Sequence, residues 1–294
     1  GNIYDFDPEK HTVPYEELPD VDKWMLGQLS KVQAEVKDAF ESYEFYRASN
    51  AIQQFCITDL SNFYLDVAKD RLYISEPNDK RRRSCQTVLK ELLEAVTSAV
   101  APILPHMAED VWQNLPYPKP TTSVFEQGWK KVDYKEHMAE EWAYLRSVRD
   151  DVNQCMEAAR TDKLIGASLE ASVYIHCEDD KGKKILESLL TDGSPLASPR
   201  PDSFNGVDDL RFLLIASQVK LASSADEVSS ACDEAHTLPL VKGTSGCFVG
   251  VAKAEGLKCD RCWFFDSEVG THNGNEGVCP RCGEAVGELA KDEE

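Results

Sequence analysis

VDKWMLGQLSKVQAEVKDAF, residues 21–40, is the stretch of sequence that decides the fold class. Its apolar residues recur at spacings of three and four, which places them along one side of an α-helix. Pro19 and Asp20 come directly before the stretch and are typical of a helix start. The stretch therefore predicts an amphipathic helix of about six or seven turns, whose apolar side needs a partner. That side consists of Val21, Trp24, Met25, Leu29, Val32, Val36 and Phe40.

Three further segments repeat this periodicity. One begins near Asn50 and continues to about Val67, the next runs from about Asp79 to Pro102, and a shorter one begins at Pro105. Four amphipathic helices joined by short links predict an antiparallel helical bundle with the aromatic residues in its core. Residues 116–137 contain prolines and a glycine that interrupt the pattern, so we expect a surface connection there.

The second half of the chain mixes helix and strand patterns. Helices are predicted at Met138–Arg160 and at 180–190, and a third begins at 207 and runs into a strand by 223. Further strands are predicted at 171–177, which reads ASVYIHC, and at 247–254. Residues 191–206 are rich in Ser, Pro and Gly and predict a flexible insertion. The expected fold class is thus mainly α: a bundle over 1–137, a helix with a small α/β unit over 138–256, a zinc ribbon over 257–286, and an acidic tail over 287–294.

Four cysteines near the C-terminus form two C-x2-C pairs: Cys259 with Cys262, and Cys279 with Cys282. Two residues between thiolates let one tight turn place both sulfurs about 2.3 Å from a single Zn²⁺, and the second pair completes a closed tetrahedral site. Four protein ligands leave no position for water or substrate, so the predicted zinc is structural. The alternative is two disulfides, which need an oxidising compartment. The first thirty residues are acidic and show no apolar run, so no secretory signal is expected.

The charge balance restricts how this chain can bind nucleic acid. The net charge is -20, whereas phosphate binding is driven by basic surface, so any such contact must use local patches. One patch is the basic run 80–83 with Lys69 and Arg71, and the other is Lys258, Arg261 and Arg281 beside Trp263. A solvated charge run and a Trp263 that forms the core of its own ribbon are the alternatives. No run of apolar residues is long enough to span a membrane.

Established catalytic motifs do not appear in the sequence. The sequence has no phosphate loop, no dinucleotide fingerprint and no H-E-x-x-H. His106 stands near Glu109 and Asp110, a set that suggests acid–base work, although packing at a helix start is its simpler explanation. We therefore expect no catalytic residue.

Three strings in the bundle carry a family resemblance. SNFYLDVAKDRLY at 61–73, RRSCQTVL at 82–89 and APILPHMAEDVW at 101–112 resemble the anticodon-binding helical domain of class I aminoacyl-tRNA synthetases. LKCDRCW at 257–263 and GVCPRCGEAV at 277–286 resemble the C-terminal zinc ribbon of the isoleucyl-tRNA synthetases of bacterial type. The combination of bundle and ribbon distinguishes these enzymes from their valine and leucine relatives.

The resemblance implies a C-terminal portion of such a ligase, with isoleucine tRNA as partner. Activation of isoleucine with ATP and Mg²⁺ would belong to a catalytic core whose HIGH-type and KMSKS-type motifs this sequence lacks, so this chain alone is expected to be inactive. A monomer is expected, located in the cytoplasm of a bacterium or in a chloroplast or mitochondrion. The implied zinc ligands are Cys259, Cys262, Cys279 and Cys282, and the implied tRNA-binding residues are Lys69, Arg71, Arg82, Arg83, Arg261, Trp263 and Arg281.

Two other functions fit parts of the sequence. A DNA glycosylase can end in a zinc finger with similar cysteine spacing, but it would need a β-sandwich where this sequence predicts helices. A zinc-ribbon module that binds other proteins is the remaining alternative.

Overall fold

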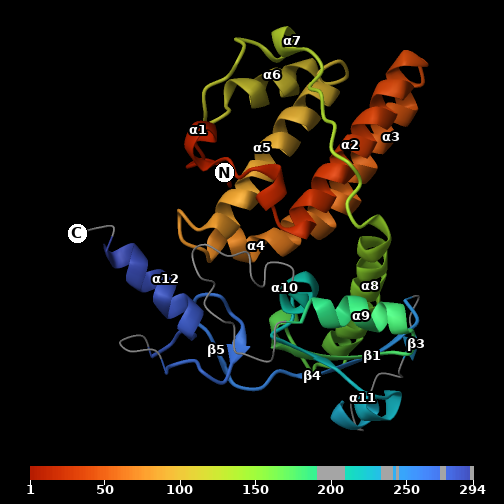
Figure 1. Ribbon diagram of the computed structural model, residues 1–294, viewed down its shortest axis with the longest axis vertical. Coiled ribbons are helices and arrows are strands. Elements are labelled where there is room, and N and C mark those ends of the chain that lie inside the picture. Colours follow the sequence, from red (N-terminus) through yellow and green to blue (C-terminus); the bar gives the residue numbers. More distant parts are fainter. Residues whose placement is uncertain (191–208, 233–240, 243–244, 272–275, 292–294) are drawn as a thin grey trace. The chain divides into compact units, whose positions relative to one another are not determined.

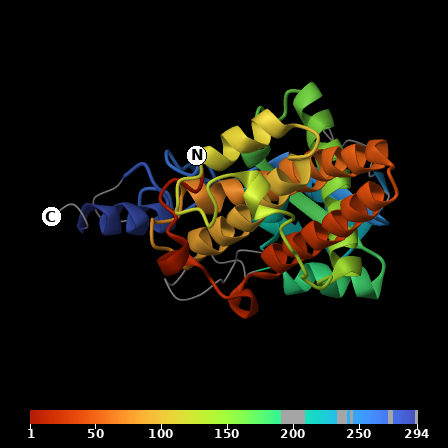
Figure 2. The ribbon, with the colours of Figure 1, turned by 90° about the horizontal axis from the view of Figure 1, so that it is seen from above.

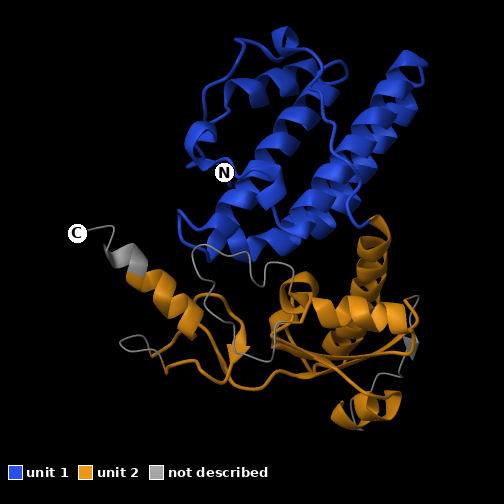
Figure 3. Cartoon of the chain, viewed as in Figure 1, with its two compact units in different colours: residues 1–138 blue, residues 139–294 orange. Residues whose placement is uncertain are grey.

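The computed structural model describes residues 1–190, 209–232, 241–242, 245–271 and 276–291. It divides into two compact units, Gly1–Met138 and Ala139–Glu294 (Figure 3). The first unit is helical, and the second combines helices with a small sheet and the cysteine pairs, which confirms the predicted fold class. The predicted flexible insertion at 191–206 lies outside the described residues.

The first unit is built around α2 (Asp20–Glu41), α3 (Phe45–Gln54) and α5 (Lys80–Val100). Figures 1 and 2 show α2 and α3 side by side as an antiparallel hairpin, and α5 contacts α2. Small residues let these helices approach closely: Val36, Ala39, Ala48 and Ala99 are all buried in one cluster. On the other helix faces, each large apolar side chain removed from water contributes about 1.5–3 kcal/mol.

Shorter elements complete this unit. The π-helix Phe55–Tyr64 and α4 (Leu65–Tyr73) continue α3 without a break, while α6 (Pro105–Gln113) and α7 (Val124–Gln127) follow α5. The segment before α2 contains α1 (Pro8–His11) and the 3-10 turn Tyr15–Glu17.

The second predicted helix begins earlier than expected and changes its pitch. The prediction placed its start near Asn50, but α3 begins at Phe45, directly after a tight turn in which Tyr43 has a φ of 58°. That turn contains neither Gly nor Pro, so no signal in the sequence marked it. The ten-residue π-helix was also unforeseen, because propensity and periodicity do not distinguish it from an α-helix.

The second unit contains a four-stranded sheet in the order β2-β1-β4-β3. β1 (Ala171–Cys177) pairs parallel with β2 (Gln218–Leu221) and antiparallel with β4 (Cys247–Lys253), and β3 (Val241–Lys242) lies at the other edge. The helix α8 (Ala139–Thr161) and the short helix α11 (Ala225–Ala231) both contact β4, and α9 (Asp180–Ser188) contacts β1. α10 (Leu210–Leu214) ends where Ile215 adopts a left-handed φ of 54°, and β2 follows it, which is the order of helix and strand predicted for 207–223.

The cysteine segment consists of the hairpin β5 (Leu257–Lys258) and β6 (Phe265–Asp266), followed by α12 (Pro280–Lys291). The helix α12 was not predicted, because the sequence was interpreted as a zinc ribbon over 257–286 and an acidic tail over 287–294. Gly283 lies within α12, where its N–H donates to the carbonyl of Cys279 over 2.9 Å. Gly283 and Gly287 lower the helix propensity of this segment, so the pattern did not indicate a helix. The helix begins at Pro280, and proline is favoured at the first position of a helix.

Among the described residues, no helix is both long enough and apolar enough to cross a bilayer.

Candidate metal centre and nucleic-acid interface

Backbone hydrogen bonds fold each cysteine pair into a knuckle. The N–H of Cys259 donates to the carbonyl of Phe264, and the N–H of Trp263 donates back to the carbonyl of Cys259, both over 2.9 Å. The second pair is tied to the first, because the N–H of Cys279 donates to the sulfur of Cys259 over 3.3 Å. The sulfurs are thus placed by main-chain geometry.

The four sulfurs fit a tetrahedral metal ion. All four Sγ atoms lie within 4.8 Å of one another, and all four residues are buried. The Sγ atoms of Cys262 and Cys279 are 3.8 Å apart, which is about the edge length of a tetrahedron whose metal–sulfur bonds are about 2.3 Å. The cluster could therefore hold a metal ion.

The electrostatics of the cluster favour a cation. Hydrogen bonds from the other three thiols lower the pKa of Cys259 below its ordinary value. The pKa values of Cys262, Cys279 and Cys282 are raised above theirs, mainly by sulfur–sulfur hydrogen bonds that include the one to Cys259. Without a cation one thiol of the cluster ionises readily, and ionisation of the other three is strongly unfavourable. A bound dication stabilises all four thiolates.

Two arginines flank the cysteines in different ways. Arg261 extends Nη1 to within 3.8 Å of the sulfur of Cys282. The guanidinium of Arg281 lies over the rings of Phe212 and Phe264, at 5.3 and 5.9 Å from their centroids, and the residue is only 5% exposed. Because Arg281 is enclosed between these rings, its role in the structure is to join the knuckles to α10.

Trp263 presents its ring to solvent. It is 59% exposed, adopts a φ of 68°, and holds Lys258 Nζ 5.1 Å from its ring centroid. A bulky residue with positive φ is strained by about 1–2 kcal/mol. The ring is therefore not the core of the ribbon, as one interpretation of the sequence had it; the adjacent Phe264 is buried in that place.

Of the residues predicted to bind tRNA in the first unit, Arg71 lies deepest in the protein. It is 2% exposed, and its guanidinium donates to both carboxylate oxygens of Asp22 over 2.8 and 2.9 Å. The hydroxyl of Tyr64 donates to the same carboxylate over 2.7 Å. Burial disfavours the charge on Arg71, but Asp22 outweighs it and the pKa of Arg71 is raised. This ion pair joins α2 to α4 inside the bundle.

The basic run at the start of α5 also has partners within the chain. Arg82 donates to the carbonyl of Leu72 over 2.9 Å and to Asp5 over 3.1 Å. Arg83 donates to Gln86 over 2.7 Å and also contacts Asp5. Positive charge at a helix start is unfavourable because it opposes the helix dipole. Here the two arginines bind the acidic segment that precedes α2, and Arg82 also caps the last turn of α4. Lys69 is the exposed member of the patch and pairs with Asp66 over 2.8 Å.

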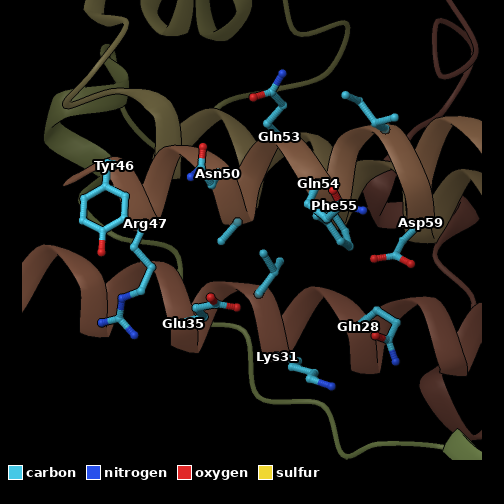
Figure 4. A pocket seen from close by; sticks show the side chains of 13 residues that line it. Gln28, Lys31, Glu35, Tyr46, Arg47, Asn50, Gln53, Gln54, Phe55 and Asp59 are labelled. Carbon is cyan, nitrogen blue, oxygen red and sulfur yellow. The ribbon is translucent and has the colours of Figure 1, made fainter. Parts of the chain in front are cut away.

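A groove that the sequence does not reveal lies between α2, α3 and the π-helix (Figure 4). It has a volume of about 810 Å³. We call it the α2–α3 groove. Figure 4 shows Arg47 extending from α3 toward α2, where Glu35 and Lys31 lie opposite. Its lining residues are Gln28, Lys31, Val32, Glu35, Tyr46, Arg47, Asn50, Ala51, Gln53, Gln54, Phe55, Ile57 and Asp59.

The composition of the α2–α3 groove suits an uncharged polar ligand. Its two cations, Lys31 and Arg47, are balanced by two carboxylates, and Arg47 already pairs with Glu44 over 2.9 Å. Amide side chains and the ring of Tyr46, which is 70% exposed, supply the remaining polar and stacking surface. No signal in the sequence could have found this groove, because polar residues on amphipathic helices look like an ordinary solvated face.

Comparison with known proteins agrees with this architecture. Residues 22–175 match the family model described as the anticodon-binding domain of tRNA ligase. The chain belongs to this family. Its similar relatives are bacterial isoleucine–tRNA ligases, which confirms the predicted resemblance.

Three cyanobacterial relatives show the extent of the match. The isoleucine–tRNA ligases of Microcystis aeruginosa and Crocosphaera subtropica are each 46% identical to this chain over 97% of its length, and that of Rippkaea orientalis is 47% identical over 98%. The chain spans only 29% of the length of each relative.

Proposed function

We propose that this chain is the tRNA-holding portion of an isoleucine–tRNA ligase. On this proposal it binds the anticodon region of isoleucine tRNA, while the rest of the ligase binds ATP and Mg²⁺ and performs aminoacylation. The proposal rests on the family match over 22–175. It also rests on relatives that are all isoleucine–tRNA ligases and that align with nearly the whole chain. Because those relatives are cyanobacterial, we also propose a cyanobacterial cytoplasm or a plastid as its location.

Two surfaces are proposed to contact the tRNA. On the ribbon, Trp263 can stack on an unpaired base, and Lys258 beside its ring and Arg261 in the same knuckle can meet phosphates. In the first unit, the α2–α3 groove can take an unpaired base, because its neutral charge balance suits a base better than a phosphate. Exposed Lys69 remains a proposed phosphate contact, whereas we assign Arg71, Arg82, Arg83 and Arg281 to the fold because each is enclosed by partners within the chain.

We also propose that the cysteine cluster holds one structural Zn²⁺ through Cys259, Cys262, Cys279 and Cys282. The support is the sulfur spacing and the absence of a vacant ligand position for substrate in a four-sulfur site. Elemental analysis of the purified reduced chain should give about one zinc per chain. A Cys262→Ser variant should lose most of it, and zinc near zero in the parent chain would refute the assignment.

The tRNA proposal is tested by gel-shift titration of the zinc-loaded chain with isoleucine, valine and methionine tRNAs at two salt concentrations. We expect the tightest binding to isoleucine tRNA, and a Trp263→Ala variant should bind more weakly by about ten-fold, the loss of one stacked base. Phe125→Ala, which removes another exposed ring, 57% accessible, is the matched control. Equal affinity for all three tRNAs would contradict anticodon recognition.

The groove is tested separately from the ribbon. Asn50→Ala combined with Gln53→Ala removes two exposed amides of the α2–α3 groove without touching its buried floor. We expect this variant to lose discrimination between isoleucine tRNA and the other two, with Gln127→Ala on α7 as the control. Unchanged discrimination would exclude the groove from recognition and leave the ribbon surface as the contact.

A further inference from the structure

The second unit contains a pair of cysteines that the metal cluster does not use. Cys177 is the last residue of β1 and Cys247 is the first residue of β4, and the two stand directly opposite each other at the end of the antiparallel ladder. Both are buried, at 9% and 0% exposure. Their position therefore places two thiols side by side at one end of the two central strands.

A tyrosine hydroxyl joins the two thiols. Tyr144, from α8, has its Oη 3.1 Å from the sulfur of Cys177 and 3.1 Å from that of Cys247. The space around them is tightly filled, because a methyl group added at Gly182 would meet both the Tyr144 hydroxyl and the Cys177 sulfur within 2.8 Å. The three groups form one packed cluster, which we call the dithiol site.

The backbone of the dithiol site already has the separation that a disulfide needs. Directly opposed residues in an antiparallel pair have Cα atoms about 4.5–5.5 Å apart, and disulfides span Cα separations of about 4.4–6.8 Å. Only the side-chain torsions have to change. We propose that Cys177 and Cys247 form a redox-active pair that closes to a disulfide when the protein meets a peroxide.

The reaction balances with hydrogen peroxide as the oxidant. The thiolate of Cys177, the more exposed of the two, attacks one peroxide oxygen, and the O–O bond breaks to leave a sulfenic acid and hydroxide. The Cys247 sulfur then attacks the sulfenic sulfur, and the S–O bond breaks to release a second hydroxide. The two thiol protons convert both hydroxides to water, so two electrons pass from the sulfurs to the peroxide.

The Tyr144 hydroxyl has a specific part in this step. It can donate a hydrogen bond to whichever sulfur is ionised, and this contact lowers the pKa of Cys247 even though burial raises that pKa to about 11 overall. A thiol with such a pKa reacts slowly with alkylating reagents. A small oxidant would have to reach the thiols through local opening of the surrounding structure.

Closure of the disulfide should stabilise the second unit. It links residues about 70 positions apart, and a cross-link of that length restricts the unfolded chain strongly. The expected effect is a rise of roughly 10 °C in the unfolding temperature of the oxidised protein. The rise should disappear on reduction with dithiothreitol.

The test uses the full zinc-loaded chain treated with hydrogen peroxide, after which free thiols are blocked, the protein is digested and the peptides are analysed by mass spectrometry. We expect a peptide pair joined through Cys177 and Cys247, two hydrogen atoms lighter than the separate peptides. Cys177→Ser and Cys247→Ser should each abolish it, while Cys155→Ser should not. Zinc content is measured in parallel, so that a shift caused by the ribbon is recognised.

A Tyr144→Phe variant distinguishes a reactive cysteine pair from two cysteines that only pack against each other. This variant keeps the ring and removes the hydroxyl, so the rate of cross-linking should fall several-fold while the protein stays folded. The proposal is overturned if Cys177 and Cys247 are recovered separately alkylated or over-oxidised, or if their cross-link forms only after the protein is unfolded in urea.

Discussion

Asp22 is the residue on which the interior of the first unit depends. It is fully buried at 0% exposure and accepts hydrogen bonds from Arg71 and Tyr64. A buried ion pair gains little net stability over an apolar pair of the same shape, because both charges lose their hydration. Removal of one partner, however, leaves the other charge buried without compensation. The pair therefore fixes how α2 and α4 meet more than it adds to stability.

We predict that Asp22→Asn destabilises the chain by about 3–5 kcal/mol, because the charge on Arg71 is then unpaired in the core. Urea denaturation followed by far-ultraviolet circular dichroism measures the loss. Glu41→Gln, which disrupts the exposed Lys37–Glu41 pair on the same helix, should change stability by less than about 1 kcal/mol. A similar small effect of both substitutions would show that solvent reaches Arg71.

Gly256 is required by both its conformation and its surroundings. It has a φ of 93°, and a Cβ there would stand 2.5 Å from the carbonyl carbon of Asp266. Gly246 also has positive φ, at 77°, but a Cβ there meets no atom of the described residues within 4 Å. A substitution at Gly246 therefore introduces backbone strain alone, whereas a substitution at Gly256 adds a steric clash.

We predict that Gly246→Ala costs only about 1–2 kcal/mol of strain, whereas Gly256→Ala costs more and opens the β5–β6 hairpin that carries the first knuckle. Transfer of zinc to a coloured chelator should be faster for Gly256→Ala and unchanged for Gly246→Ala. Equal transfer rates would mean that the hairpin can shift to accept a methyl group.

At this scale the sequence predicts chemistry better than it predicts contacts. The spacing of Cys259, Cys262, Cys279 and Cys282 sufficed to predict a cluster, because C-x2-C pairs act through local turns. Arg71, Arg82 and Arg83 were predicted to contact tRNA, and in the structure they contact Asp22, Leu72 and Asp5 within the chain. Those partners lie as far as 78 positions away along the chain, so only the tertiary structure shows them.

Among the elements, α5 is held by charges at both its start and its middle. At the middle, Glu94 accepts from Lys90 over 3.1 Å and also pairs with Lys130, which in turn pairs with Glu91 over 2.9 Å. Burial alone would raise the pKa of Glu94, but the lysines outweigh it and that pKa is lowered from 4.5. At the start, burial likewise opposes the charge on Asp5, and Gln86, Arg82 and Arg83 outweigh it, so its pKa is lowered from 3.8.

These shifts predict acid sensitivity with a definite sign. A carboxyl whose pKa is lowered by folding binds fewer protons in the folded state, so its contribution is complete above the unfolded pKa and is lost as the pH falls through the folded pKa. We predict that the unfolding temperature declines below about pH 5 and that Glu94→Gln makes the decline shallower. Glu41→Gln is the control, and an equally steep decline in the Glu94 variant would contradict the assignment.

The sequence predicted a helix wherever the apolar repeat extends over many turns, but it did not predict where each helix begins and ends. α2, α5 and α8 follow the predicted spans closely, since each carries an unbroken apolar stripe over many turns. The short helix α11 and the helix α12 escaped prediction, because the first has only seven residues and the second contains glycines. The strand β1 was predicted correctly from alternating β-branched and aromatic residues.

At the scale of the whole chain, the two compact units have separate means of stabilisation. The first has a helical core, while the second contains the cysteine cluster as well as its sheet. Because the four cysteines that we propose as zinc ligands all belong to Ala139–Glu294, metal loss should act on that unit first.

We predict that a strong chelator lowers the unfolding temperature of the second unit and leaves that of the first unit unchanged. Calorimetry of the chain with and without zinc should show one transition that moves and one that stays. A fragment of residues 1–138 should reproduce the transition that stays, because its core is complete in itself. If both transitions move together, the two units unfold cooperatively.

The net charge of -20 restricts binding by the whole chain without excluding it. Repulsion from the acidic surface must be offset within about 10 Å of each phosphate contact, the distance over which salt screens charge. The charge excess, the C-x2-C pairs and the helical class could all be read from the sequence. The α2–α3 groove and the dithiol site could not, because each forms only when separate elements pack together.

The solvent-facing ring of Trp263 makes the ribbon optically distinguishable from the rest of the protein. Trp24, Trp112 and Trp142 are at most 2% exposed and Trp129 is half-buried, against 59% exposure for Trp263. Indole emission shifts to longer wavelength in water, so the red edge of the protein's fluorescence originates mainly from the knuckle. A nucleobase stacked on that ring would quench this component, so RNA binding at the ribbon can be followed in the unlabelled protein.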